Sequence, residues 1–170
     1  MFGLELHPAV VHYPIALGVV GAVSVLGYAI VPHERLRWVG PILLTLALAG
    51  AGAAYFSGES AKDRAADAGV PDTEITRHES ISIWSLGVLS LATLLAWATG
   101  ASRRGAWVAA PVAVAAAGMI LWTSHLGGRL VFIYGAGHVP KSAVPAIPNP
   151  GQPAEPGSKE EGGGRGPESP

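Results

Sequence analysis

The sequence contains no cysteine among its 170 residues. This absence excludes disulfide bonds, cysteine-ligated iron–sulfur clusters, thiolate catalysis and the covalent attachment of a c-type haem. Histidine imidazoles and carboxylates are therefore the strongest ligands that the chain can offer to a metal ion or a haem.

Charged residues are also scarce. Asp, Glu, Lys and Arg make up 14% of the chain, compared with about a quarter in ordinary soluble domains. Hydrophobic residues make up 49%, and the mean hydropathy is +0.38. A net charge of −1 lacks the basic excess that is typical of proteins that bind nucleic acid, so we expect no nucleic-acid partner. This composition predicts an integral membrane protein in contact with a lipid bilayer.

Four stretches of about 20 residues or more contain no charged side chain, and each could cross roughly 30 Å of hydrocarbon as a helix. Backbone that spans a membrane has to satisfy its own hydrogen bonds, and these stretches lack the alternating pattern of barrel strands. The sequence therefore predicts an all-α, integral membrane four-helix bundle, with helices near residues 9–31, 38–56, 81–99 and 106–126.

The charges in the connections predict the orientation of the bundle. The turns at 32–37 and 100–105 lie on one side and carry four arginines against a single acid, Glu34. The segment 57–79 on the opposite side carries three basic residues and six acidic ones. The positive-inside rule then places the arginine-bearing turns in the cytoplasm and both termini outside it.

Aromatic and small residues support the same arrangement. Gly50 and Gly52, with the alanines around them, form a thin surface on the second helix, which predicts close helix packing. Tryptophans lie near the ends of the predicted spans, where interfacial aromatic residues are expected: Trp38, Trp84, Trp97, Trp107 and Trp122.

Two segments outside the spans differ in composition. Residues 59–68 are rich in alanine and charge and are followed by Gly69 and Pro71, which predicts a short helix on the outer face. From Pro140 onward, eight prolines and six glycines fall within 31 residues, a composition that cannot bury a core. We therefore expect a membrane domain over residues 1–139 and a disordered tail over residues 140–170.

Five of the six histidines are expected on the outer side of the membrane. His33 lies in an arginine-bearing turn, whereas His7 and His12 begin the first helix, His78 begins the third and His125 ends the fourth. Antiparallel packing brings these last four positions to one face, at one level. His12 lies inside the apolar span, about 7.5 Å deeper than His7 at the helical rise, where a polar residue is costly and a functional role is the first hypothesis. The pattern predicts a cofactor or metal site, and the alternative is a set of interfacial histidines that cap helices.

Two carboxylates and one apolar segment accompany these histidines. Glu59 follows the second span and Glu79 adjoins His78, so that either could bind a metal ion or orient a ligating imidazole. Both could equally be solvated acids. The paired glycines at 127–128 are expected to end the fourth helix. The apolar run 130–134 that follows predicts a lid over the outer mouth of the bundle, or an anchor in the lipid headgroups.

Several short motifs occur together in order: His7-Pro8, Val11-His12-Tyr13-Pro14, Ser57-Gly58-Glu59-Ser60-Ala61, His78-Glu79, His125-Leu126-Gly127-Gly128 and Gly135-Ala136-Gly137. In this combination, over about residues 5–139, the chain resembles a large family of small bacterial four-helix membrane proteins, the domain of unknown function 2231. The resemblance implies the same topology in a bacterial inner (cytoplasmic) membrane and points to the same histidines. It brings no established activity, although it hints at a cytochrome-like partner. The chain departs from the family's pattern at Arg129, where an acidic residue is expected, and at Phe132, where a tyrosine is expected.

The first function that fits the histidines is b-type haem binding in an electron-transfer chain. Four-helix bundles place cofactor ligands on facing helices, so His12 with His125 or His78 could take the two axial positions. The thin surfaces of the second and fourth helices would make room for the porphyrin, and Arg77 or Arg129 could bind its propionates. A redox protein or another membrane protein would then be the partner.

Two alternatives remain open. One is a transition-metal ion held by the imidazoles of His7, His12, His78 and His125, with Glu59 or Glu79, because histidine suits zinc, copper and iron alike. The other is a non-catalytic membrane scaffold. No motif predicts a catalytic residue.

Overall fold

The computed structural model describes residues 10–31, 33–99 and 102–136 of the chain. Over these residues the chain forms no β-strand and four long helices: α2 (His12–Ile30), α3 (Leu36–Asp67), α4 (Asp72–Thr99) and α5 (Arg103–Phe132). Each helix is long and apolar enough to cross a membrane. The prediction of an all-α membrane protein with four spans is confirmed. The predicted tail, residues 140–170, lies outside the described residues.

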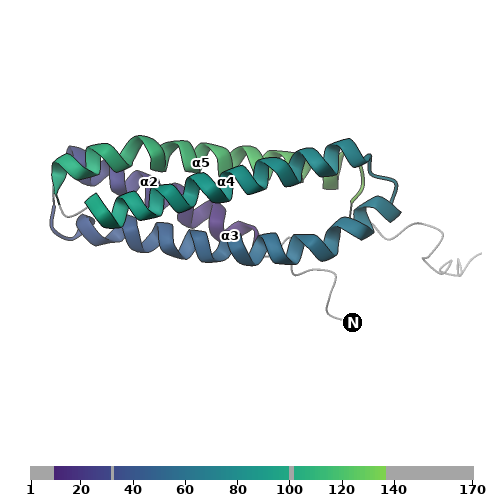
Figure 1. The fold of residues 1–170 in the computed structure, drawn as a ribbon, viewed down its shortest axis with the longest axis horizontal. Coiled ribbons are helices and arrows are strands. Elements are labelled where there is room, and N and C mark those ends of the chain that lie inside the picture. The colour runs from purple at the N-terminus through teal and green to yellow at the C-terminus, as the bar shows by residue number, and fades with distance from the viewer. Residues whose placement is uncertain (1–9, 32, 100–101, 137–170) are drawn as a thin grey trace, which may run out of the picture. The chain divides into compact units, whose positions relative to one another are not determined.

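The helices form an antiparallel bundle in which α2 and α4 each pack against both α3 and α5 (Figure 1). At one end of the bundle, α2 and α4 finish while α3 and α5 begin. We call this the arginine end, since it carries Arg35, Arg37, Arg103 and Arg104. At the opposite end, α2 and α4 begin while α3 and α5 finish. We call this the histidine end, since it carries His12, His78 and His125.

The segment 59–68 is helical, as predicted, but it continues α3 and is not a separate helix. The sequence becomes polar near Glu59 because the chain leaves the apolar layer, whereas the backbone hydrogen bonds continue through residues that favour helix. The helix ends where Gly69 adopts a φ of 82°. The amides of Gly69 and Val70 donate to the carbonyls of Ala66 and Ala65, which is the Schellman pattern.

The paired glycines do not end the last helix, so that expectation is wrong. α5 continues through Gly127 and Gly128 to Phe132, because a glycine inside a helix costs only about 1 kcal/mol. The predicted lid is therefore the last turn of α5 and the residues just after it. Phe132 and Ile133 are 87% and 65% exposed, so they do not cover the mouth of the bundle. Their exposure fits the alternative of an anchor in the lipid headgroups.

Small residues bring the helices together. Gly40 of α3 lies so close to α2 that a Cβ there would stand 2.5 Å from Val25 Cγ2 and 3.0 Å from the Val25 amide nitrogen. Gly50 of α3 approaches Pro14 in the same way, with a hypothetical Cβ at 3.2 Å from Pro14 Cδ. The predicted thin surface of small residues therefore allows close packing at Gly50, whereas Gly52 faces open space. Such close approach is how helices associate where lipid removes the hydrophobic driving force.

Alanines fill the core between the helices. α5 contributes a row of buried alanines, and Ala109, Ala113 and Ala116 in this row have no exposed area. Ala92 and Ala96 of α4 belong to the same buried cluster. The small side chains of α5 are therefore occupied by contacts with neighbouring helices. In contrast, all five tryptophans are exposed, as expected of residues that face lipid near the membrane surfaces.

Candidate histidine site

His12 and His125 lie at the same depth on neighbouring helices. Gly18 of α2 packs against Ile120 of α5, where a Cβ on the glycine would stand 2.8 Å from Ile120 Cδ1. From this contact, His12 is six residues and His125 five residues towards the histidine end, which is about 9 Å and about 7.5 Å along the two helix axes. Both histidines are exposed. The structure therefore places two imidazoles on the surface of the bundle at one depth.

The His125 ring is held against a tryptophan on its own helix. The ring centroids of His125 and Trp122 are 5.6 Å apart, and the two planes are inclined by 28°. A separation of three residues puts both rings on the same face of α5. The tryptophan thus restricts the orientation of the imidazole on the exposed face.

His78 occupies a different surface from His125. The sequence predicted that His78 begins its helix. The helix α4 begins at Asp72, however, so His78 lies in its second turn. Its partly buried ring faces Gly127 of α5, where a Cβ would stand 3.2 Å from His78 Cε1. Gly127 is two residues, or about 200° of helical rotation, from His125. The side chains of His78 and His125 therefore lie on opposite faces of α5.

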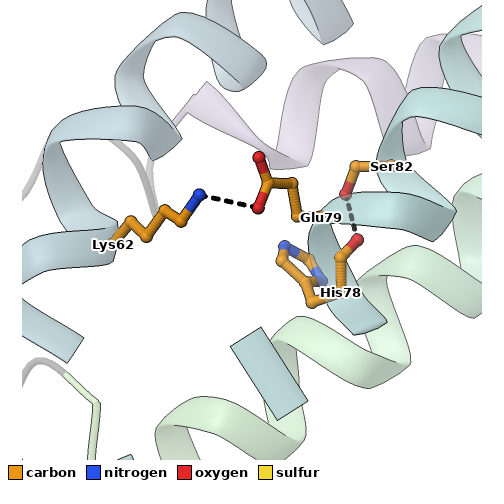
Figure 2. A network of polar contacts seen from close by, with 4 residues as sticks. All are labelled: Lys62, His78, Glu79 and Ser82. Atoms are coloured by element: carbon orange, nitrogen blue, oxygen red, sulfur yellow. Dashed lines mark hydrogen bonds and ion pairs between the residues drawn. The ribbon is translucent and has the colours of Figure 1, made fainter. Parts of the chain in front are cut away.

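Glu79 pairs with a lysine. Figure 2 shows Lys62 of α3 directed at the Glu79 carboxylate, with Lys62 Nζ 2.8 Å from Glu79 Oε2. The hydrogen bond to this carboxylate raises the pKa of Lys62 above its ordinary value. This pair joins α3 and α4 where both helices continue towards the histidine end. The sequence had suggested that Glu79 could bind a metal ion or orient a ligating imidazole. Glu59, the other predicted carboxylate ligand, is exposed on α3.

Arg129 also links two helices. Its Nη2 lies 3.7 Å from Glu74 Oε1 on α4 and donates to the Tyr134 hydroxyl at 3.4 Å. The sequence suggested that Arg129 could bind a haem propionate, whereas the structure directs it to Glu74. Sequence reasoning missed Lys62 and Glu74 as partners, because opposite charges 17 and 55 residues apart meet only when the helices pack.

A partly buried hydroxyl pair also escaped the sequence reasoning. Ser85 Oγ of α4 and Thr123 Oγ1 of α5 are 2.7 Å apart. Since the Ser85 hydroxyl donates to the Ile81 carbonyl, Thr123 supplies the hydrogen between the two side chains. Such a bond ties two helices together inside the membrane layer. No sequence signal distinguishes these two residues from the other serines and threonines of the spans.

The described residues hold no group of three or more histidine, aspartate or glutamate side chains arranged to bind one metal ion. His7 and His138 lie outside the described residues, so the participation of His7 stays a prediction. Of the predicted site residues, the structure brings His12 and His125 to one depth and places His78, Glu79 and Arg129 in contacts between α4 and its neighbours.

All four helices fall within a single family match. Residues 3–140 match the model of the family described as "Predicted membrane protein (DUF2231)". No curated protein and no solved structure matches the chain. Because the matched region covers most of the chain and includes the candidate histidines, the resemblance found in the sequence motifs is confirmed: the chain belongs to the DUF2231 family of membrane proteins.

Proposed function

We propose that the protein binds a transition-metal ion through His12 and His125 at the histidine end of the bundle. The observation that carries this proposal is their common depth on the adjacent helices α2 and α5. Imidazole nitrogen suits zinc, copper and iron, and two imidazoles leave coordination positions for water or for a further ligand. His7, five residues before His12 in the sequence, is the proposed third ligand.

The packing of the bundle favours a metal ion over a haem. Two axial imidazoles have to stand on opposite faces of a porphyrin, and in a bundle the ring lies in the core between them. Here Ala109, Ala113 and Ala116 are fully buried in helix contacts, so a macrocycle in the core would require the helices to separate. A metal ion needs only imidazole nitrogens about 2.0–2.1 Å from it.

Haem b binding with electron transfer is the second candidate, supported by the exposure of His12 and His125. Because both side chains are exposed, a porphyrin held by them would lie outside the core. Arg129, which was expected to bind a propionate, is already directed at Glu74 and would not be available without losing that contact.

The test uses the full chain, purified in detergent with an affinity tag that contains no histidine. Metal content is measured by mass spectrometry after expression in medium supplied with zinc, copper and iron, and an optical spectrum is recorded on the same sample. We expect an equimolar metal ion that is lost in His12→Ala and His125→Ala. The control is the variant His33→Ala, which should retain the metal, because His33 is exposed in the turn at the arginine end.

Each contrary outcome is informative. A Soret band that disappears in the same two variants would replace the metal ion with haem. A wild-type protein without metal or haem, or equal metal content in all variants, would overturn both candidates and leave a non-catalytic membrane scaffold. Stability of the variants is compared by thermal unfolding, so that loss of metal is separated from loss of fold.

A further inference from the structure

The arginine end carries positive charge that its own acid does not balance. The two turns there contain four arginines and a single acid, Glu34. Arg35, Arg103 and Arg104 are exposed. The two ion pairs found among the described residues both lie at the histidine end and involve Lys62 and Arg129. The cationic side chains at the arginine end are therefore available to an anion outside the chain.

Arg37 is the most constrained of these arginines. Its guanidinium carbon lies 4.7 Å from the ring centroid of Trp38. Its Nε is buried, and no described residue accepts a hydrogen bond from it. The side chain lines a narrow crevice, with a volume of about 10 Å³, beside Tyr28 of α2 and Ala106 of α5. A guanidinium held over an aromatic ring and without a carboxylate partner is suited to a phosphate group.

A second arginine converges on the same end of α2. Arg103 Nε donates to the carbonyl of Ala29 at 3.0 Å, which fixes the base of its guanidinium next to Tyr28. Arg37 of α3 and Tyr28 of α2 line the same crevice. Two positive side chains from different helices thus lie beside consecutive residues of α2, Arg37 beside Tyr28 and Arg103 beside Ala29.

An exposed aromatic surface lies next to Arg37. The ring centroids of Trp38 and Trp97 are 5.8 Å apart, and both side chains are 46% exposed. Trp97 Nε1 donates to Thr45 Oγ1 at 2.9 Å, which holds the ring in place. Indole rings at this position suit the region of a lipid between its headgroup and its acyl chains.

We infer that the arginine end binds an anionic phospholipid. Arg37 is partly exposed although its Nε is buried, and it donates to the lipid phosphate through its terminal guanidinium nitrogens. Arg103 adds a second positive charge, and the surface formed by Trp38 and Trp97 contacts the glycerol and upper acyl region. The occupant is a lipid and not free phosphate, because the cations adjoin apolar rings that face the bilayer. This site is independent of the proposed metal site, which lies at the opposite end of the bundle.

The experiment is native mass spectrometry of the full chain in detergent, titrated with phosphatidylglycerol or with phosphatidylcholine. We expect phosphatidylglycerol to bind at least about fivefold more tightly than phosphatidylcholine, the preference that one basic residue near an anionic lipid supplies. Arg37→Gln should remove most of this preference. The matched control is Arg64→Gln, an exposed arginine near the end of α3 at the histidine end, which should retain it.

Three results would overturn the inference. One is equal binding of the two lipids by the wild type. Another is an equal loss of preference in Arg37→Gln and Arg64→Gln, which would show a response to net charge alone. The third is displacement of phosphatidylglycerol by millimolar inorganic phosphate, which would make the site a general anion site. Phosphatidylcholine binding and thermal unfolding serve as the measures of intact fold, so a misfolded Arg37→Gln is recognised and replaced by Arg37→Lys, for which we expect a partial loss.

Discussion

The two ends of the bundle use their charged side chains in different ways. At the histidine end, α3, α4 and α5 extend past the start of α2 (Figure 1), and Lys62 and Arg129 each reach a carboxylate on α4. At the arginine end the connections are short, and four arginines accompany a single acid. Ion pairs between side chains therefore join helices at the first end, whereas at the second no described carboxylate pairs with an arginine, and Arg103 instead bonds to the Ala29 carbonyl. Similar residue types can therefore stabilise the fold at one end and, in the lipid site that we propose, bind a partner at the other.

The largest expected difference between the ends is their side of the membrane. The positive-inside rule predicts that the arginine end is cytoplasmic. Because the chain has no cysteine, single cysteines can be introduced at Asp67 for the histidine end and at Ser102 for the arginine end, both of them exposed. An impermeant maleimide applied to intact cells should label Asp67→Cys and not Ser102→Cys. The reverse pattern would show that the orientation is inverted.

The next largest effect concerns close packing of α2 against α3. Gly40→Ala places a Cβ against the backbone of Val25, and we expect a loss of about 1–3 kcal/mol in the free energy of unfolding. Gly52→Ala is the matched control on the same helix, because no atom lies within 4 Å of its Cβ position. The control should be neutral or up to about 1 kcal/mol more stable, as alanine favours helix over glycine. Unfolding in mixed detergent measures both, and equal stability of the two variants would contradict this account of the crossing.

A smaller effect is expected from the hydroxyl pair that joins α4 and α5. A double-mutant cycle with Ser85→Ala and Thr123→Val isolates the bond between them. Interhelical hydrogen bonds in membranes average about 0.6 kcal/mol, so we expect a coupling energy of that order. A coupling energy of zero would mean that each hydroxyl is satisfied equally well by its own helix, as Ser85 already is in part through Ile81.

The smallest effect belongs to the partly exposed pair of Lys62 and Glu79. The folded-state pKa of Lys62 is raised above the ordinary value of 10.5, so the protonated lysine favours the folded state. This contribution is fully present below 10.5 and is lost as the pH rises through the folded-state pKa. Lys62→Gln should therefore lower the unfolding temperature slightly at neutral pH, and the gap to wild type should close in strongly alkaline buffer. A gap that widens with pH would contradict the assigned direction. The effect is small because exposed ion pairs are screened by water.

Much of the fold could be predicted because lipid imposes strict demands on a spanning segment. The charge-free stretches identified the four helices, and their antiparallel order placed His12, His78 and His125 at one end. The helix ends were harder to predict. Polarity marks where the chain leaves the membrane, but α3 and α5 continue beyond that point because backbone hydrogen bonds persist in water. The glycines at 127–128 led to a wrong prediction of the end of the last helix. Gly127 lies inside α5, where it contacts His78.

The candidate site shows the same division. Amino-acid composition and the spacing of charge determined by themselves that this chain is a four-span membrane protein of all-α class, because no side-chain contact is needed to make an uncharged stretch favour lipid. The sequence already predicted one level for His12 and His125. Only the tertiary structure decided that both are exposed, that His78 lies on another face of α5, and that Glu79 pairs with Lys62. Those relations depend on the rotation and crossing of the helices. A rotation of about 100° per residue changes which side chains meet without altering the hydropathy of the sequence.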